Sequence, residues 1–217
     1  MKTSRHAMTS EQASKKKLKG HAREMIRKIQ LGEDSTIIKG TGKADIRRGD
    51  GTTESVKGGK KTQWALYCIS RILMDKYFSK EEMDAFIKWV NFIPDNKEEW
   101  EINRKYYSLN PYAVDLVEVF ENNPMKLITY FCGINIVDYL VTEDSRDGVW
   151  RQTSMDDFSI KMKDNIKDVY YTDGGKLVIS GGVKNNILFE LELRKGKNSH
   201  KSILFHSPLH KIIDCLK

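Results

Sequence analysis

The sequence predicts a single α/β or α+β domain with a mixed β-sheet, and its segment order supports this. Residues 15–78 combine a helix with short strands, residues 79–145 predict a block of helices, and residues 149–217 predict strands with a short final helix. The 217 residues, 39% of them hydrophobic, suffice for one core, so the domain is expected to span 1–217.

The first predicted helix covers residues 15–32 and follows a polar N-terminal arm. Apolar residues recur on one face of it, and Gly32 follows as a stop signal. Basic residues fill the remaining surface, and Glu24 is the only acid. The apolar face consists of Leu18, Ala22, Met25, Ile26 and Ile29.

A short strand at 36–40 leads into a predicted β-hairpin over 43–61. Its turn, Gly-Asp-Gly-Thr, contains Asp50, which we interpret as a turn residue. Alternation along the strands places one set of side chains on a common side: Lys43, Asp45 and Arg47 in the first strand, and Ser55 and Lys57 in the second. Glu54 and Val56 point the other way, and Glu54 is expected to be exposed.

The middle of the chain predicts helices. Residues 62–78 are apolar almost all round, which indicates a buried helix. Ser79 and Glu82 form a capping box that begins the next helix. Two Asn-Pro pairs begin two more helices, the second of which is expected to run to Val141.

The C-terminal part predicts strands. Asp173-Gly-Gly joins residues 168–172 and 176–180 into a hairpin, and residues 186–194 form a strand with one apolar and one mostly charged face. Another strand follows at 202–207, and Pro208 opens a short terminal helix.

Composition leaves several partners open. The net charge is +7, and the stretch from Ser14 to Lys61 holds fourteen Lys/Arg against six Asp/Glu. Such a field suits nucleic acid, anionic membranes or acidic proteins. Three widely spaced cysteines show no metal-ligand spacing, and no apolar run is long enough to cross a bilayer. We expect a soluble intracellular protein with reduced thiols.

The hairpin resembles the active-site hairpin of the PD-(D/E)xK nuclease superfamily, to which most type II restriction endonucleases belong. The matching residues are GKADI at 42–46 and SVKGG at 55–59. A basic helix, a strand, the hairpin and the predicted apolar helix, over about residues 18–78, are similar to the αβββα core order of that superfamily. The resemblance implies a restriction-endonuclease-like core with an inserted helical block.

The resemblance also implies roles for individual residues. Asp45 and the carbonyl of Val56 would bind Mg²⁺, with Glu24 assisting from the helix. Lys57 would assist water activation, and Gln63 would be an accessory polar residue at the start of the following helix.

One position departs from the pattern of the superfamily. Ser55 occupies the position of the second acid among the catalytic residues, so the site either keeps one strong metal ligand or passes the second ligand role to Glu24 or Asp50. The simpler interpretation of Asp45 and Lys57 is a surface ion pair between neighbouring strands.

The implied substrate is double-stranded DNA, cut at a specific short sequence by a homodimer in the cytoplasm of a prokaryote. The expected DNA contacts are Lys43, Arg47, Lys60, Lys61, Arg194 and Lys197. Two other functions stay open: a non-catalytic basic DNA-binding protein, and a repair or junction nuclease of the same superfamily. A competing acidic site is conceivable at Glu190 and Glu192 with Asp173.

Overall fold

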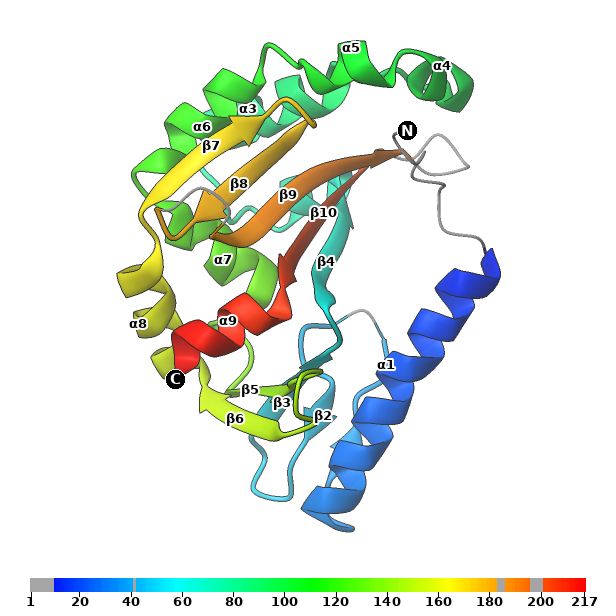
Figure 1. Cartoon of the computed structure of the whole chain (residues 1–217), viewed down its shortest axis with the longest axis vertical. Helices are drawn as coiled ribbons and strands as arrows, with labels where there is room; N and C mark the ends of the chain where they lie inside the picture. Colours follow the sequence, from blue (N-terminus) through cyan, green and yellow to red (C-terminus); the bar gives the residue numbers. More distant parts are fainter. Residues whose placement is uncertain (1–9, 41, 183–185, 196–200) are drawn as a thin grey trace.

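The computed structural model describes residues 10–40, 42–182, 186–195 and 201–217. The chain forms a mixed α/β structure in which two five-stranded sheets lie one above the other (Figure 1). The expectation of one mixed sheet is therefore corrected to two sheets, one mixed and one antiparallel.

Sheet A is the mixed sheet, and it contains the predicted hairpin. Its strand order is β1-β2-β3-β5-β6. The β3–β5 pair is parallel and the other neighbours are antiparallel. The strands are β1 (Thr36–Ile37), β2 (Ile46–Arg47), β3 (Thr53–Gly58), β5 (Tyr139–Glu143) and β6 (Trp150–Ser154).

Sheet B is antiparallel and has the order β4-β10-β9-β8-β7. It contains the predicted C-terminal hairpin and both strands that follow it, so these predictions are confirmed. The strands are β4 (Lys61–Cys68), β7 (Asp168–Thr172), β8 (Lys176–Ser180), β9 (Ile187–Lys195) and β10 (Lys201–Pro208). The turn from β3 into β4 carries the chain from sheet A to sheet B.

A group of helices covers one face of sheet B (Figure 1). They are α2 (Ile69–Met74), α3 (Lys80–Asn91), α6 (Ala113–Glu121) and α7 (Pro124–Cys132). The short helices α4 (Lys97–Ile102) and α5 (Arg104–Ser108) lie beyond the upper ends of the strands. The capping box predicted at Ser79 and Glu82 is present at the start of α3. Two further helices are α8 (Met155–Asn165) and the predicted terminal helix α9 (Leu209–Leu216).

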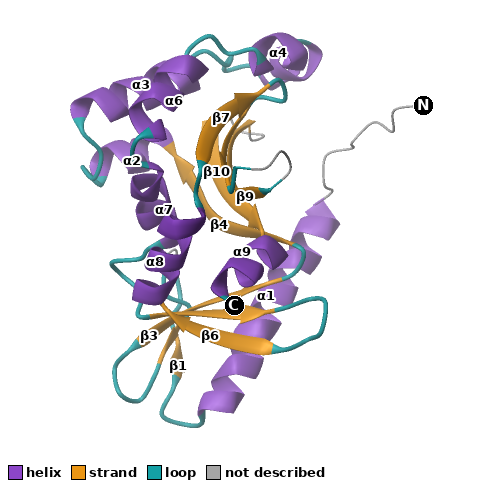
Figure 2. Ribbon diagram, turned by 60° about the vertical axis from the view of Figure 1, so that its left-hand side comes forward, coloured by secondary structure: helices purple, strands orange, loops and turns teal. Residues whose placement is uncertain are grey.

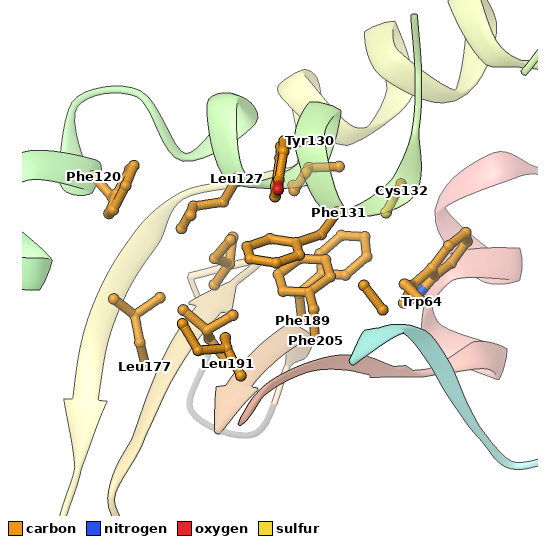
Figure 3. Close-up of a cluster of buried hydrophobic side chains, with 14 of the residues drawn as sticks. Trp64, Phe120, Leu127, Tyr130, Phe131, Cys132, Leu177, Phe189, Leu191 and Phe205 are labelled. Atoms are coloured by element: carbon orange, nitrogen blue, oxygen red, sulfur yellow. The ribbon is translucent and has the colours of Figure 1, made fainter. Parts of the chain in front are cut away.

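The main core lies between this helical layer and sheet B (Figure 3). Phe205 stands at its centre, stacked on Phe131 of α7 at 4.9 Å between ring centroids and on Phe189 of β9 at 5.1 Å. Offset aromatic stacks of this kind add to the stabilisation that burial alone supplies. Sheet A has a much smaller apolar cluster, made by Ile46, Val56 and Val141.

Helix α1 (Ser10–Leu31) stands at the periphery and packs only its C-terminal half along sheet A (Figure 2). Two ion pairs attach it to the sheet, Arg23 to Glu143 and Arg27 to Glu54. The apolar face from which the helix was predicted, Leu18, Ala22, Met25, Ile26 and Ile29, lies on its exposed side.

Three segments differ from the prediction. Residues 61–68 form strand β4 where a buried helix was expected, and only α2 beyond them is helical. Residues 139–143 form β5, where the last predicted helix was to continue; that helix ends at Gly133, whose φ of +76° caps α7. Helix α8 begins after Ser154, whose hydroxyl accepts a hydrogen bond from the Asp157 amide, inside a region predicted as strands.

Candidate active site

The candidate site lies where β2 separates from β3. The amide of Asp45 donates to the Glu54 carbonyl at 2.7 Å, and among the described residues this is the last backbone hydrogen bond between the two segments on this side. The next amide, that of Val56, donates instead to the Asp45 carboxylate at 2.7 Å. The Asp45 side chain thus takes the place of a backbone acceptor, and this hydrogen bond holds the carboxylate beside β3.

Three donors converge on one oxygen, Oδ2 of Asp45. Besides the Val56 amide they are the Ser55 hydroxyl at 3.2 Å and the Lys57 ammonium at 3.1 Å. The side chains of Lys57 and Asp45 are 15% and 22% exposed, so the pair is shielded but still reached by solvent. The predicted common side of Asp45, Ser55 and Lys57 is confirmed by these contacts.

The Lys57 ammonium also lies 3.4 Å from the carbonyl oxygen of Val56. It therefore sits between two oxygens, one from Asp45 and one from Val56, and these are two of the three groups that the resemblance assigns to Mg²⁺; the third is Glu24. A carboxylate and a carbonyl are ligands of the kind that Mg²⁺ accepts, with water or phosphate oxygens completing its shell. In the part of the chain described, no three His, Cys, Asp or Glu gather around a common metal position.

Glu24 is not brought to Asp45 by any contact in the described structure. Its carboxylate pairs with Nδ1 of His21 at 3.1 Å, one turn away on α1. Glu24 is nevertheless 19% exposed and lies on the inward side of the helix with Arg27. Its role as second metal ligand stays a prediction. Asp50 accepts from the amide and hydroxyl of Thr52, which confirms its interpretation as a turn residue.

Gln63 lies in a strand of sheet B, and the helix expected to carry it is absent. It is exposed on β4 and stands opposite His206 of β10 in the ladder. The prediction that Gln63 lies at the start of a helix is therefore wrong, and an accessory role for its side chain stays a prediction.

Lys43 has internal partners. Its ammonium donates to the carbonyl of Phe131 in the last turn of α7 at 2.6 Å and lies 4.5 Å from the centre of the Tyr67 ring. Burial lowers the pKa of Lys43 to about 8. A Cβ at Gly133 would stand 2.8 Å from the stem of this lysine, so glycine leaves the room that Lys43 needs. Lys43 thus caps α7 and ties the chain before Asp45 to the main core.

The other expected DNA contacts fall into three groups. Arg47 and Lys60 are exposed. Lys61 and Arg194 are also accessible but pair with Glu190 and Glu192. Lys197 lies outside the described residues.

Sequence reasoning missed Thr142, a neighbour of the site. Thr142 is the ladder partner of Lys57 in the parallel β3–β5 pair and is 2% exposed. Partners in a ladder share a face, so the threonine borders Lys57 within the sheet. Thr142 directly follows the predicted end of the last helix at Val141, inside the block 79–145 that was expected to be helical, so no strand neighbour of Lys57 was sought there.

On the other face of β3 lies a second carboxylate with a different environment. Glu54 was expected to be exposed, but its side chain is fully buried. Arg27 donates to both of its oxygens at 2.8 and 2.9 Å, and Arg48 donates at 2.7 Å. Burial alone would raise the pKa of Glu54, but the two guanidinium groups outweigh it and lower the pKa. This clamp joins α1, β2 and β3.

The competing acidic site is a charge cluster on sheet B. Glu190 and Glu192 are each 8% exposed, and His206 lies between them. Its Nε2 hydrogen-bonds to Glu192 at 3.4 Å, whereas its Nδ1 lies 3.2 Å from a Glu190 oxygen but is not oriented to form a hydrogen bond with it. Lys61 and Lys176 neutralise Glu190. Asp173 is exposed in the β7–β8 turn, so the proposed triplet does not form.

Comparison with known proteins adds no assignment. No protein-family model matches this chain, and no curated protein matches it either. Among the described helices, none combines the length and the apolar character needed to cross a bilayer.

Proposed function

We propose that the chain is a Mg²⁺-dependent endodeoxyribonuclease that cuts double-stranded DNA at a short specific sequence, as type II restriction endonucleases do. The proposal includes a homodimer and a prokaryotic cytoplasmic setting. One observation carries it: Asp45, the Val56 carbonyl and Lys57 meet within hydrogen-bond distance at the end of a strand pair. Those are the residues that the resemblance selects, although they come from two separate strands.

The chemistry of these groups suits phosphodiester hydrolysis. Bound Mg²⁺ would supply positive charge beside the scissile phosphate. Asp45 and the Val56 carbonyl would hold it, and both are fixed by the backbone of β3. Lys57 can orient a water molecule and offset negative charge on the phosphate. Ser55, buried at 1% exposure, donates to Asp45 and helps to fix its orientation.

An ordinary ion pair would also bring Asp45 and Lys57 together. Two features favour the catalytic interpretation. The carboxylate accepts three donors on a single oxygen, which fixes it in one orientation. The surrounding segment, residues 14–61, also holds fourteen Lys/Arg against six Asp/Glu, so the net positive charge of the chain is concentrated there, which favours contact with the phosphates of DNA.

The test is cleavage of plasmid DNA with Mg²⁺. Wild-type protein is expected to give discrete fragments, and chelation of the metal should abolish them. Lys57→Ala and Asp45→Asn should each lower the rate by roughly 100-fold or more, since each removes a group acting at the phosphate. Lys105→Ala, on exposed helix α5 far from sheet A, is the matched control and should cut at the wild-type rate.

Each other outcome of this assay would support a different function or a different site. Binding of duplex DNA without cleavage would replace the proposal by a non-catalytic DNA-binding protein. Smeared products, or preference for branched DNA, would favour a repair or junction nuclease. Cleavage by Lys57→Ala at the wild-type rate would remove the site assignment while leaving nuclease activity.

A further inference from the structure

Helix α1 presents its apolar side to solvent. Leu18 is 66% exposed, Met25 51% and Ile29 73%. Ala22, between them, is also exposed. We call these four residues the α1 stripe. Exposed apolar residues are ordinary when scattered, but a continuous row along one helix indicates a surface that is covered in the working protein.

The stripe lies opposite the attachment of α1 to sheet A. Arg27 follows Met25 by two residues, which is about 200° around a helix of 3.6 residues per turn. Arg27 is buried against Glu54, so the stripe points directly away from the sheet. The inward side of this helix is charged and the outward side apolar, the reverse of an ordinary surface helix.

Spacing and shape favour another helix as the partner. Leu18, Ala22, Met25 and Ile29 are separated by four, three and four residues, which is the a/d spacing of a helix–helix seam. The order of these spacings is the same from either end of the helix. If two copies of α1 run antiparallel, Leu18 lies opposite Ile29 and Ala22 lies opposite Met25, so large side chains meet the small one.

Charge decides the direction. Lys15, Lys16, Lys17 and Lys19 crowd the N-terminal half of α1, whereas Glu33 and Asp34 follow its C-terminal end and are exposed. Parallel pairing would bring the lysine runs of both copies together. Antiparallel pairing in this register places Lys16 and Lys17 of each copy beside the end of the partner helix, where Glu33 and Asp34 follow, although Lys19 then lies opposite Lys28. The opposite charges at the two ends of the seam favour this orientation over the parallel one.

We infer that the α1 stripe is a homodimer interface in which α1 of one copy packs antiparallel on α1 of a second copy. This names the surface of the homodimer included in the proposed function, but it is argued from the exposure, spacing and charge of α1 and not from the nuclease site. A mass measurement without DNA or Mg²⁺ tests it, so its failure and failure of the nuclease proposal are separate results.

The first experiment measures the molar mass of the full chain by light scattering after size exclusion. The expected mass is about 50 kDa, twice the 25.1 kDa of one chain. The double variant Met25→Glu/Ile29→Glu should run as a monomer with an unchanged circular dichroism spectrum. Ile102→Glu, at an 80% exposed position on α4, is the control and should stay dimeric. A monomeric wild type would assign the stripe to a different partner and overturn the inference, as would a dimer that survives the double variant.

A charge swap tests the antiparallel direction. Lys16→Glu/Lys17→Glu should raise the dimer dissociation constant by about tenfold or more, because acids would then face acids. Lys15 is left unchanged because it pairs with Glu11 of the same helix. Adding Glu33→Lys/Asp34→Lys to the same chain should restore the wild-type constant. Weakening without restoration would contradict antiparallel pairing.

Discussion

Sheets A and B bury their interiors in different ways. Sheet B carries the main apolar core, in which Phe205 stacks between Phe131 and Phe189. Sheet A has three buried apolar residues in its own cluster and relies on a buried carboxylate clamped by two arginines. The candidate site lies on sheet A, at the end of its shortest internal strand.

This difference separates the part of the molecule that packs the core from the part that carries the candidate site. A packed aromatic core tolerates no charged group without a partner, so it leaves little room for a reactive carboxylate. The two faces of β3 divide the work: Glu54 on one face is fully neutralised, whereas Asp45 on the other has Lys57 as its cationic partner and stays partly open to solvent. Sheet B packs the main apolar core of the fold, and sheet A holds the polar groups of the candidate site.

The largest expected effect comes from breaking the clamp on sheet A. Glu54→Ala leaves Arg27 and Arg48 buried without their carboxylate, and loss of one partner from a buried ion pair costs about 3–5 kcal/mol. Equilibrium unfolding in urea should show this loss in the free energy of unfolding. Cleavage activity should fall as well, since the clamp fixes β2 against β3 beside Asp45.

Two controls accompany this variant. Glu118→Ala, at an exposed position on α6, should change the free energy of unfolding by less than about 0.5 kcal/mol. Replacing the whole clamp with Arg27→Met, Arg48→Met and Glu54→Leu should regain most of the loss, because no charge is then left unpaired. A loss below about 1 kcal/mol for Glu54→Ala would contradict the dependence of sheet A on the clamp.

Sheet B also carries buried ionisable groups, and the free energy of unfolding should therefore change with pH in the acidic range. Burial alone would raise the pKa of Glu192, but the hydrogen bond with His206 and the charges of Arg194 and Lys176 outweigh it and lower the pKa to about 2, against an ordinary 4.5. The unfolded chain therefore binds the proton more tightly than the folded one. The stabilisation is complete above about pH 4.5 and is lost as the pH falls toward about 2, by up to about 3 kcal/mol.

The measurement compares wild type with Glu192→Gln in urea at several pH values. Several other carboxylates, including Glu190, also have a lowered pKa, so the difference between the two proteins is the informative quantity. The stability advantage of wild type over the variant should shrink between pH 5 and pH 2. An advantage that stays constant over this range would show that Glu192 has no such partners in solution.

Several features of the two sheets and of the helical layer could be predicted from local sequence patterns. The α3 capping box, the β7–β8 hairpin and the meeting of Asp45 with Lys57 follow from residue spacing. The charged clamp could not be predicted, because Arg27 and Glu54 lie far apart in sequence and only the packing of α1 brings them together. For the same reason an apparently exposed Glu54 proved to be fully buried.

Strand β4 was missed for a physical reason. A strand is recognised by alternation with a period of two, and β4 pairs with β10 across a bulge between Phe205 and His206. The bulge puts Trp64 and Ala65 in succession on the buried side, so the segment appears apolar all round, as a buried helix does. For β5, the signal was present in Gly133, whose left-handed conformation ends α7 before the strand begins.

The smallest expected effect separates the helical layer from the site. The Ser79 hydroxyl accepts from the Glu82 amide at 3.2 Å, and the Glu82 carboxylate accepts from the Ser79 amide at 2.6 Å. Ser79→Ala removes one of these bonds and should cost about 1 kcal/mol, whereas Ser79→Thr should retain most of it. Helix α3 belongs to the layer over sheet B, so plasmid cleavage by both variants should proceed at the wild-type rate at temperatures where they are folded. Slower cleavage by Ser79→Ala with an intact fold would mean that the helical layer takes part in positioning the candidate site, and sheet A alone would no longer account for the proposed activity.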